Sequence, residues 1–177
     1  PDVLIVVDNA SRDDSLHLAQ KDFPQLVTIR NSENVGFAKA VNQGLRKARE
    51  LGVTHAWLFN PDARARKNAL SRLILAARVI PRALFSPIIF NSQGEVWFSG
   101  GELSWWRMRA LHRKVICVRT EGSEDFLTGC ALFFPLTAVD SVGEFDESYF
   151  LYYEDTDFCV RAKRAGFQLC VVPESKV

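Results

Sequence analysis

The sequence predicts an α/β fold in which a doubly wound, mostly parallel sheet with a Rossmann-like order occupies the first half of the chain. Between residues 3 and 80, three short apolar runs alternate with three longer amphipathic segments. The runs have the length of strands and the segments have helical spacing, so their order is that of consecutive βαβ units. From residue 85 onward the alternation fails, which predicts a less regular second half.

The first strand is expected at residues 3–7, whose continuous apolar character is typical of a strand buried on both faces. Ser11 is expected to cap the first helix, which continues to Gln20. Gly52 is well placed to end the second helix, and Pro81 follows the third. The remaining elements of this half are strands at 26–29 and 55–59 and helices at 37–51 and 70–80.

The second half is expected to contain short strands separated by glycine-containing or charged loops. Residues 126–135 read as a strand with a glycine in it, and Gly166 is expected to stop the last helix. The other expected elements are strands at 85–90, 95–98, 115–118 and 167–172 and helices at 136–142 and 156–165. We expect residues 1–177 to form one domain, since its length lies in the usual range for one.

Composition narrows the classes of function. The chain is 47% hydrophobic and 24% charged with a net charge of +1, which is the profile of a packed globular protein. Basic residues do not form a stripe, so a nucleic-acid partner is not predicted. One basic group, at residues 107–114, suits a solvated loop face, an anionic substrate or a membrane surface.

The cysteines and the hydropathy pattern bear on the compartment. Cys117, Cys130, Cys159 and Cys170 are widely spaced and lack metal-ligand spacing, which favours reduced thiols in a cytoplasmic protein. No apolar run reaches the length of a membrane span. Peripheral association with the inner face of the cell membrane stays open.

Polar residues follow each of the first three strands. They are Asp8 and Asn9, the turn at 31–34, and the pair Asn60 and Asp62. Ligands in open α/β sheets bind beyond the carboxyl ends of strands, so we expect these residues along one rim. Asp8 suits either a nucleoside contact or a helix cap, and Gly36 suits either an anion site at a helix start or an ordinary turn.

Asp62 is a candidate metal ligand. A carboxylate on a rigid turn suits a Mg²⁺ or Mn²⁺ ion that bridges two phosphates, and Asn60 would add a neutral oxygen. Taken alone, the Asn-Pro-Asp sequence also suits a plain turn.

The segment at 149–157 sets three carboxylates directly after five mostly aromatic residues. Carboxylates beside an apolar wall tend to have raised pKa values, which suits a general base. We assign that function to Glu154 and Asp155, whereas Asp157 suits the acidic first turn of a helix. Thr128 and Gly129 are small residues in an apolar run, which indicates either close approach of a ligand or a bulge.

Five motifs in this order resemble those of family 2 glycosyltransferases, and among them the bacterial rhamnosyltransferase-like branch. The motifs are Val7-Asp8-Asn9-Ala10-Ser11, Asn34-Val35-Gly36-Phe37-Ala38, Asn60-Pro61-Asp62, Phe126-Leu127-Thr128-Gly129-Cys130-Ala131 and Tyr153-Glu154-Asp155-Thr156-Asp157. The resemblance implies a GT-A fold and transfer of a sugar, with inversion, from a nucleotide-diphosphate donor to a hydroxyl acceptor.

The resemblance also implies a role for each candidate residue. Asp155 would be the catalytic base, with Glu154 as its partner, and Thr128 and Gly129 would line the acceptor side. Asp62 would hold Mg²⁺ or Mn²⁺. Residues 1–84 would form the nucleotide-sugar-binding half and residues 85–177 the acceptor-side half. The implied donor-binding residues are Asp8, Asn9, Asn34, Gly36, Phe37, Asn42, Asn60 and Asp62.

Substrates follow from the branch. The resemblance implies a dTDP- or UDP-sugar donor, with rhamnose as the sugar, and a glycan or lipid-linked acceptor in bacterial surface polysaccharide or glycolipid synthesis. Asn60 stands where the family often has a first acid, which makes metal dependence less secure. The family's first strand would precede Pro1, and a histidine often found after the last strand would follow Val177, so donor binding and turnover are expected to be weak.

Two other classes of protein share a βαβ order. One is another nucleotide-binding transferase, such as a nucleotidyltransferase, and the other is an inactive nucleotide-sugar-binding module. A dinucleotide-dependent oxidoreductase is disfavoured, because no Gly-x-Gly-x-x-Gly follows the first strand.

Overall fold

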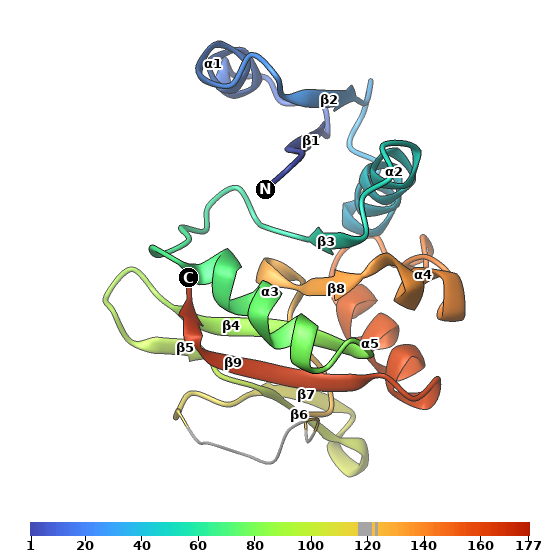
Figure 1. The fold of residues 1–177 in the computed structure, drawn as a ribbon. Helices are drawn as coiled ribbons and strands as arrows, with labels where there is room; N and C mark the ends of the chain where they lie inside the picture. The colour runs from blue at the N-terminus through green and yellow to red at the C-terminus, as the bar shows by residue number, and fades with distance from the viewer. Residues whose placement is uncertain (117–121, 123) are drawn as a thin grey trace.

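A computed structural model describes residues 1–116, 122 and 124–177 (Figure 1). Its largest sheet has five strands, in which β4 pairs with β8, β5 and β9, and β8 pairs in turn with β3. The strands are β3 (His55–Trp57), β4 (Ala83–Phe90), β5 (Val96–Phe98), β8 (Phe133–Pro135) and β9 (Gln168–Lys176).

Helices cover both faces of this sheet (Figure 1). Side chains alternate between faces along a strand, so Leu84 and Leu169 pack into one apolar cluster, whereas Phe85 and Cys170 pack into another. The first cluster also contains α5 residues such as Phe158, and the second contains α3 residues such as Leu73. The helices concerned are α3 (Ala69–Val79), α4 (Leu136–Val142) and α5 (Glu154–Arg164).

A separate two-stranded parallel sheet holds the beginning of the chain, at the top of Figure 1. The prediction of a strand buried on both faces is wrong here. Each residue of β1 is only half-buried, and within the described residues β1 pairs with β2 alone. This part comprises β1 (Ile5–Asp8), α1 (Ser15–Asp22), β2 (Val27–Arg30) and α2 (Phe37–Glu50).

The α/β fold class is confirmed, and the large sheet is mixed. Strand β8 runs antiparallel to both β3 and β4, while β4 and β9 are parallel. Among the described residues, the predicted parallel pairing therefore holds for β1–β2 and β4–β9 only.

The second half contains a hairpin that the sequence analysis missed. Strands β6 (Gly101–Ser104) and β7 (Arg109–His112) pair antiparallel across the 3₁₀ turn η1 (Trp105–Arg107). The strand predicted at 115–118 is wrong for Val115 and Ile116, which are not in a strand. Residues 117 and 118, and with them Cys117, lie outside the described residues.

Three other predicted boundaries are corrected. Residues 126–135 are a strand only in β8, because the 3₁₀ turn η2 (Gly129–Ala131) interrupts the run. Helix α1 begins at Ser15, since the Ser11 amide donates to Asp8 Oδ1 (2.9 Å) in the turn that precedes the helix. Helix α5 begins at Glu154, two residues earlier than predicted, so the paired carboxylates belong to its first turn.

Candidate active site

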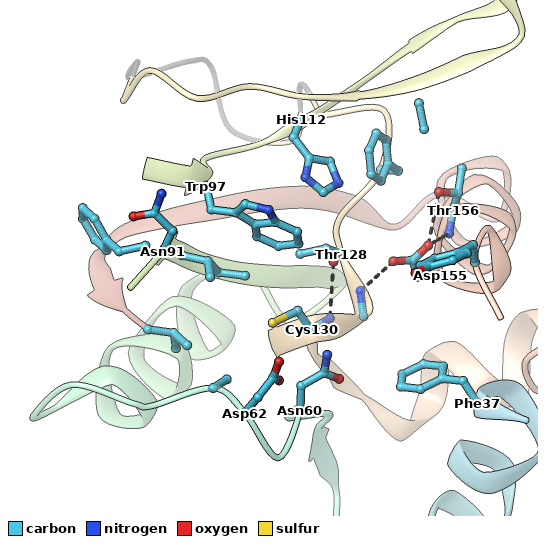
Figure 2. A pocket seen from close by; sticks show the side chains of 18 of the residues that line it. Phe37, Asn60, Asp62, Asn91, Trp97, His112, Thr128, Cys130, Asp155 and Thr156 are labelled. Carbon is cyan, nitrogen blue, oxygen red and sulfur yellow. Dashed lines mark hydrogen bonds between the residues drawn. The ribbon is translucent and has the colours of Figure 1, made fainter. Parts of the chain in front are cut away.

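A cleft of about 1270 Å³ opens between β5, β7, the segment after β3, the η2 turn and the start of α5. Figure 2 shows it from close by. Aromatic, carboxylate and amide side chains from both halves of the chain line it. The predicted site residues among them are Phe37, Asn60, Asp62, Thr128, Gly129, Glu154 and Asp155.

The η2 turn joins the two carboxylate-bearing segments. The Gly129 amide donates to Asp155 Oδ2 (2.7 Å), and the next residue's carbonyl, that of Cys130, accepts from the Asn60 amide (2.9 Å). Figure 2 shows Asp62 and Asn60 on one side of this turn and Asp155 on the other. Residues far apart in the sequence are therefore held against consecutive residues of one turn.

Asp155 is fixed by three hydrogen bonds. Besides the bond from Gly129, its Oδ1 accepts from the Thr156 amide (2.6 Å) and the Thr156 hydroxyl (3.2 Å). Gly129 is also closely packed, because a Cβ there would lie 3.3 Å from Phe37 Cε1 and 3.4 Å from Asp155 Cβ. The carboxylate is thus oriented within the cleft by its own backbone and by η2.

Glu154 differs from its neighbour in its environment. Its side chain is buried, and its Oε2 has no hydrogen-bond partner among the described residues. Burial raises the pKa of Glu154 above its ordinary value, and the charge of Asp155 raises it further, while a backbone bond opposes them. Glu154 therefore carries a desolvation cost when ionised.

Replacing Glu154 with glutamine is expected to make unfolding stability less dependent on pH. The folded chain keeps the Glu154 proton above pH 4.5, where the unfolded chain loses it. Stability from the protonated group is therefore complete below pH 4.5 and is lost as pH rises through the raised pKa. In urea unfolding, the free energy of unfolding of Glu154→Gln relative to that of the wild type should be higher at pH 8 than at pH 4.5. The same difference between the two proteins at both pH values would contradict this environment for Glu154.

Asp62 is exposed at the edge of the cleft. Burial raises the pKa of the nearby Cys130 thiol to about 11, with a smaller contribution from the charge of Asp62, so the thiol is protonated at neutral pH. Within the described residues, no three His, Cys, Asp or Glu side chains gather as a metal site. A single carboxylate fits only an ion that takes most of its ligands from a substrate and water.

Five predicted donor residues, Asp8, Asn9, Asn34, Gly36 and Asn42, do not line this cleft. Asn9 Oδ1 accepts from Asn31 Nδ2 (2.8 Å), and its Nδ2 donates to the Gly36 carbonyl (3.2 Å), so the ends of β1 and β2 are joined. Asn34 Oδ1 accepts from the Gly36 amide (3.0 Å). Hydrogen bonding to the Ser11 side chain and backbone lowers the pKa of Asp8.

Asn42 is buried and holds the chain rather than facing the cleft. Its Nδ2 donates to the Phe145 carbonyl (2.8 Å) and to Glu147 Oε1 (3.0 Å), and its Oδ1 accepts from the Phe145 amide (2.9 Å). Both amide donors are thus used within the protein. The observed role of Asn42 is to anchor the segment that precedes the aromatic loop.

Gly36 and the start of α2 are covered by the aromatic loop at residues 149–153. Gly36 has φ +87°, and a Cβ on it would lie 2.8 Å from the Phe150 carbonyl oxygen. That same oxygen accepts from the Phe37 amide (2.9 Å). Of the two alternatives at this helix start, an anion site and an ordinary turn, the structure favours the turn, because the first amide of α2 binds the protein itself.

Replacing Gly36 with alanine is expected to lower stability by more than replacing Gly52. Both glycines have positive φ, which costs an alanine about 1–2 kcal/mol at Gly52 and more at Gly36, whose ψ of 167° lies in a region essentially restricted to glycine. A Cβ at Gly52 meets nothing within 4 Å. Gly36→Ala also pushes the Phe150 backbone away. We expect Tm to fall by about 2–8 °C for Gly52→Ala and further for Gly36→Ala in thermal melts. An equal decrease in Tm for Gly36→Ala and Gly52→Ala would contradict the contact between residue 36 and Phe150.

Sequence reasoning missed several residues of the cleft wall. Trp97 on β5 and His112 on β7 meet edge-to-face with ring centroids 4.6 Å apart, and both line the cleft. Burial lowers the pKa of His112, which favours the neutral imidazole. Arg64 and Arg66 line the cleft on the segment that carries Asp62. Their basic cluster after Asp62 was visible in the sequence, but no sequence signal brings β5 and β7 to this site.

Comparison with known proteins agrees with this architecture. An N-acetylglucosaminyl-diphospho-decaprenol L-rhamnosyltransferase of Mycobacterium tuberculosis is 27% identical over 202 residues, which cover 100% of this chain and 66% of that protein. The dTDP-rhamnosyl transferase RfbF of Shigella flexneri is 24% identical, with 98% of this chain and 58% of that protein covered. The chain thus spans about two thirds or less of the length of these relatives.

A solved structure shares the fold. The crystal structure of GalNAc-T7 with UDP, GalNAc and Mn²⁺ superposes with a TM-score of 0.77 at 14% identity, covering 98% of this chain and 37% of that one. The GT-A fold is thereby confirmed. The sequence model of glycosyl transferase family 2 matches residues 2–135, which is most of the chain. The chain therefore belongs to glycosyl transferase family 2.

Proposed function

We propose that the cleft transfers a sugar, with inversion, from a nucleotide-diphosphate donor to a hydroxyl acceptor. The observation that carries the proposal is the η2 turn, which holds the Asn60–Asp62 segment and Asp155 through consecutive residues. The reaction needs a base on one side of the anomeric carbon and charge stabilisation on the other. In this proposal residues 1–84 bind the donor and residues 85–177 the acceptor.

Asp155 is the catalytic base in this mechanism. Its carboxylate takes the proton of the acceptor hydroxyl while that oxygen forms a bond to the anomeric carbon. The bond between the anomeric carbon and the diphosphate breaks in the same step, and the nucleoside diphosphate leaves with the electron pair. The bonds from Gly129 and Thr156 hold the carboxylate in position, and no covalent intermediate is formed.

Asp62 would hold a divalent cation, Mg²⁺ or Mn²⁺, with Asn60 beside it. The cation would neutralise charge on the leaving diphosphate. Support comes from the exposed carboxylate of Asp62 at the cleft edge and from GalNAc-T7, whose structure contains Mn²⁺. Arg64 and Arg66, on the same edge, would add positive charge near the phosphates.

The proposed donor is a dTDP- or UDP-sugar, with dTDP-rhamnose first, and the proposed acceptor is a lipid-linked glycan of a bacterial surface polysaccharide or glycolipid. The names of the mycobacterial and Shigella relatives support rhamnose, and that of the mycobacterial enzyme supports an acceptor on a polyprenol. Among the described residues, no helix has the length and apolar character to cross a bilayer. Such an acceptor would bring a cytoplasmic enzyme to the inner face of the cell membrane.

A donor screen by thermal shift tests the proposal, with protein expressed from its complete reading frame. At about 100 times its Kd, a donor contributes about 2.7 kcal/mol, which should raise Tm by about 5–10 °C. We expect this rise with dTDP-rhamnose and Mn²⁺, and transfer to an N-acetylglucosaminyl-diphospho-lipid. A rise without transfer to any hydroxyl acceptor would indicate a binding module, and no rise with any nucleotide sugar would overturn the proposal.

A further inference from the structure

We propose that the end of the β6–β7 hairpin docks on the surface of an anionic phospholipid membrane. The docking tip consists of Trp105, Trp106, Arg107, Met108 and Arg109. The inference rests on the proposed function in one respect: a lipid-linked acceptor lies in a membrane and so gives the docking a purpose. The docking itself is measurable without sugar transfer.

The tip exposes an unusual amount of apolar surface. Trp106 is 96% exposed, Met108 81% and Trp105 67%. Single exposed apolar residues are ordinary on protein surfaces, but three large exposed apolar side chains within four consecutive residues mark a candidate interaction site. Tryptophan is also the side chain most typical of the boundary between water and lipid.

A rigid stem presents the tip. The two strands pair over four residues each, from Gly101 opposite His112 to Ser104 opposite Arg109. Below them, the Arg113 amide donates to the Gly100 carbonyl (2.8 Å), and the Arg113 side chain is buried in an ion pair with Glu124. In Figure 1 the hairpin lies at the edge of the molecule opposite α1 and β2. The tip thus stands at the end of a hydrogen-bonded two-stranded stem.

The charge of the tip complements an anionic surface. Arg107 and Arg109 are exposed, and within the described part of the chain neither forms an ion pair with a carboxylate. No Asp or Glu occurs between residues 103 and 116, so no carboxylate of this segment offsets the two arginines. Basic side chains next to tryptophans are the combination that binds the headgroup region of anionic bilayers.

The position of the tip suits an enzyme that works at a membrane. Its exposed side chains lie on the turn between β6 and β7. The same hairpin reaches the cleft, because Ala110 and His112 of β7 line it. A docked tip would therefore hold the cleft beside the lipid surface, where the acceptor lies.

Sedimentation with lipid vesicles tests the proposal on protein expressed from its complete reading frame. The probes are vesicles of phosphatidylcholine with 30% phosphatidylglycerol and vesicles of phosphatidylcholine alone. We expect the partition coefficient to be at least tenfold higher on the anionic vesicles, and to fall at least tenfold in Trp105→Ser/Trp106→Ser and in Arg107→Glu/Arg109→Glu. The exposed-apolar control Leu75→Ser/Val79→Ser, on α3, should bind like the wild type.

Three results would overturn the docking: equal partition of the tip variants and the wild type, equal binding to both vesicle types, or a tip-dependent dimer in size-exclusion chromatography without lipid. Transfer to a short water-soluble acceptor separates the two proposals. Tip variants should keep this activity and lose transfer to an acceptor embedded in vesicles. Vesicle binding without any transfer would refute the proposed function alone, and transfer without vesicle binding would refute the docking alone.

Discussion

Replacing Asp155 with asparagine is expected to lower kcat by about 10²- to 10⁴-fold, with little change in donor binding. Asparagine keeps the shape of the side chain and can still accept from the Gly129 amide, but its amide cannot take a proton from the acceptor hydroxyl. Steady-state transfer assays and calorimetry with the donor give the two quantities. Donor affinity is expected to stay within a few-fold because the base acts on the acceptor.

Asp157→Asn is the matched control. Asp157 lies on the same helix, pairs with Arg161 (2.7 Å) and does not line the cleft. Loss of this half-exposed i,i+4 pair should leave kcat nearly unchanged. Full activity of Asp155→Asn would exclude the base role. Wild-type activity in Asp155→Asn but a large loss in Glu154→Gln would transfer that role to Glu154.

Replacing Asp62 with alanine is expected to remove the effect of Mn²⁺ on donor binding and to lower kcat/KM by about a hundredfold or more. A metal ion supplies several kcal/mol of stabilisation to a leaving diphosphate, and each 1.36 kcal/mol corresponds to about a factor of ten in rate. Thermal shift with and without Mn²⁺, followed by transfer assays, measures both effects.

Asp22→Asn serves as the control for Asp62. Asp22 is an exposed carboxylate at the end of α1, away from the cleft, so its replacement changes net charge equally. It should leave the response to Mn²⁺ unchanged. Retention of Mn²⁺-dependent donor binding by Asp62→Ala would show that the cation is held elsewhere.

Much of the first half could be predicted, because its strands are compact apolar runs with polar ends. Helix α2 was predicted almost to the residue, since its amphipathic pattern is long and Gly52 follows it. The run at 126–135 was predicted wrongly for a physical reason. Leu127 and Leu132 are fully buried although neither lies in a strand. The apolar run therefore indicated which residues are buried, but it did not indicate their backbone conformation.

Site residues in local motifs could likewise be predicted, whereas those brought to the cleft by long-range pairing could not. Asp62 and Asp155 were found because each stands in a motif that is local in the sequence. Trp97 and His112 were missed because they face the cleft only through the pairing of β5 with β4 and of β7 with β6. The roles of Asn42 and Gly36 in anchoring residues 145–150 are also contacts between distant segments, which a single sequence does not reveal.

The η2 turn also determines where this chain can be joined to a homologue. A chimaera joined at residue 84 would take Asn60 from one parent and the Cys130 carbonyl that binds its amide from the other. Phe37 and Gly129, which pack against each other, would be divided in the same way. The bond from Asn60 to Cys130 joins backbone atoms and can form in such a chimaera, but the packing of Phe37 depends on residue type, because a Cβ at position 129 would lie 3.3 Å from its ring. A graft of the first half that keeps Phe37 therefore needs glycine at position 129, so the two halves are not freely exchangeable.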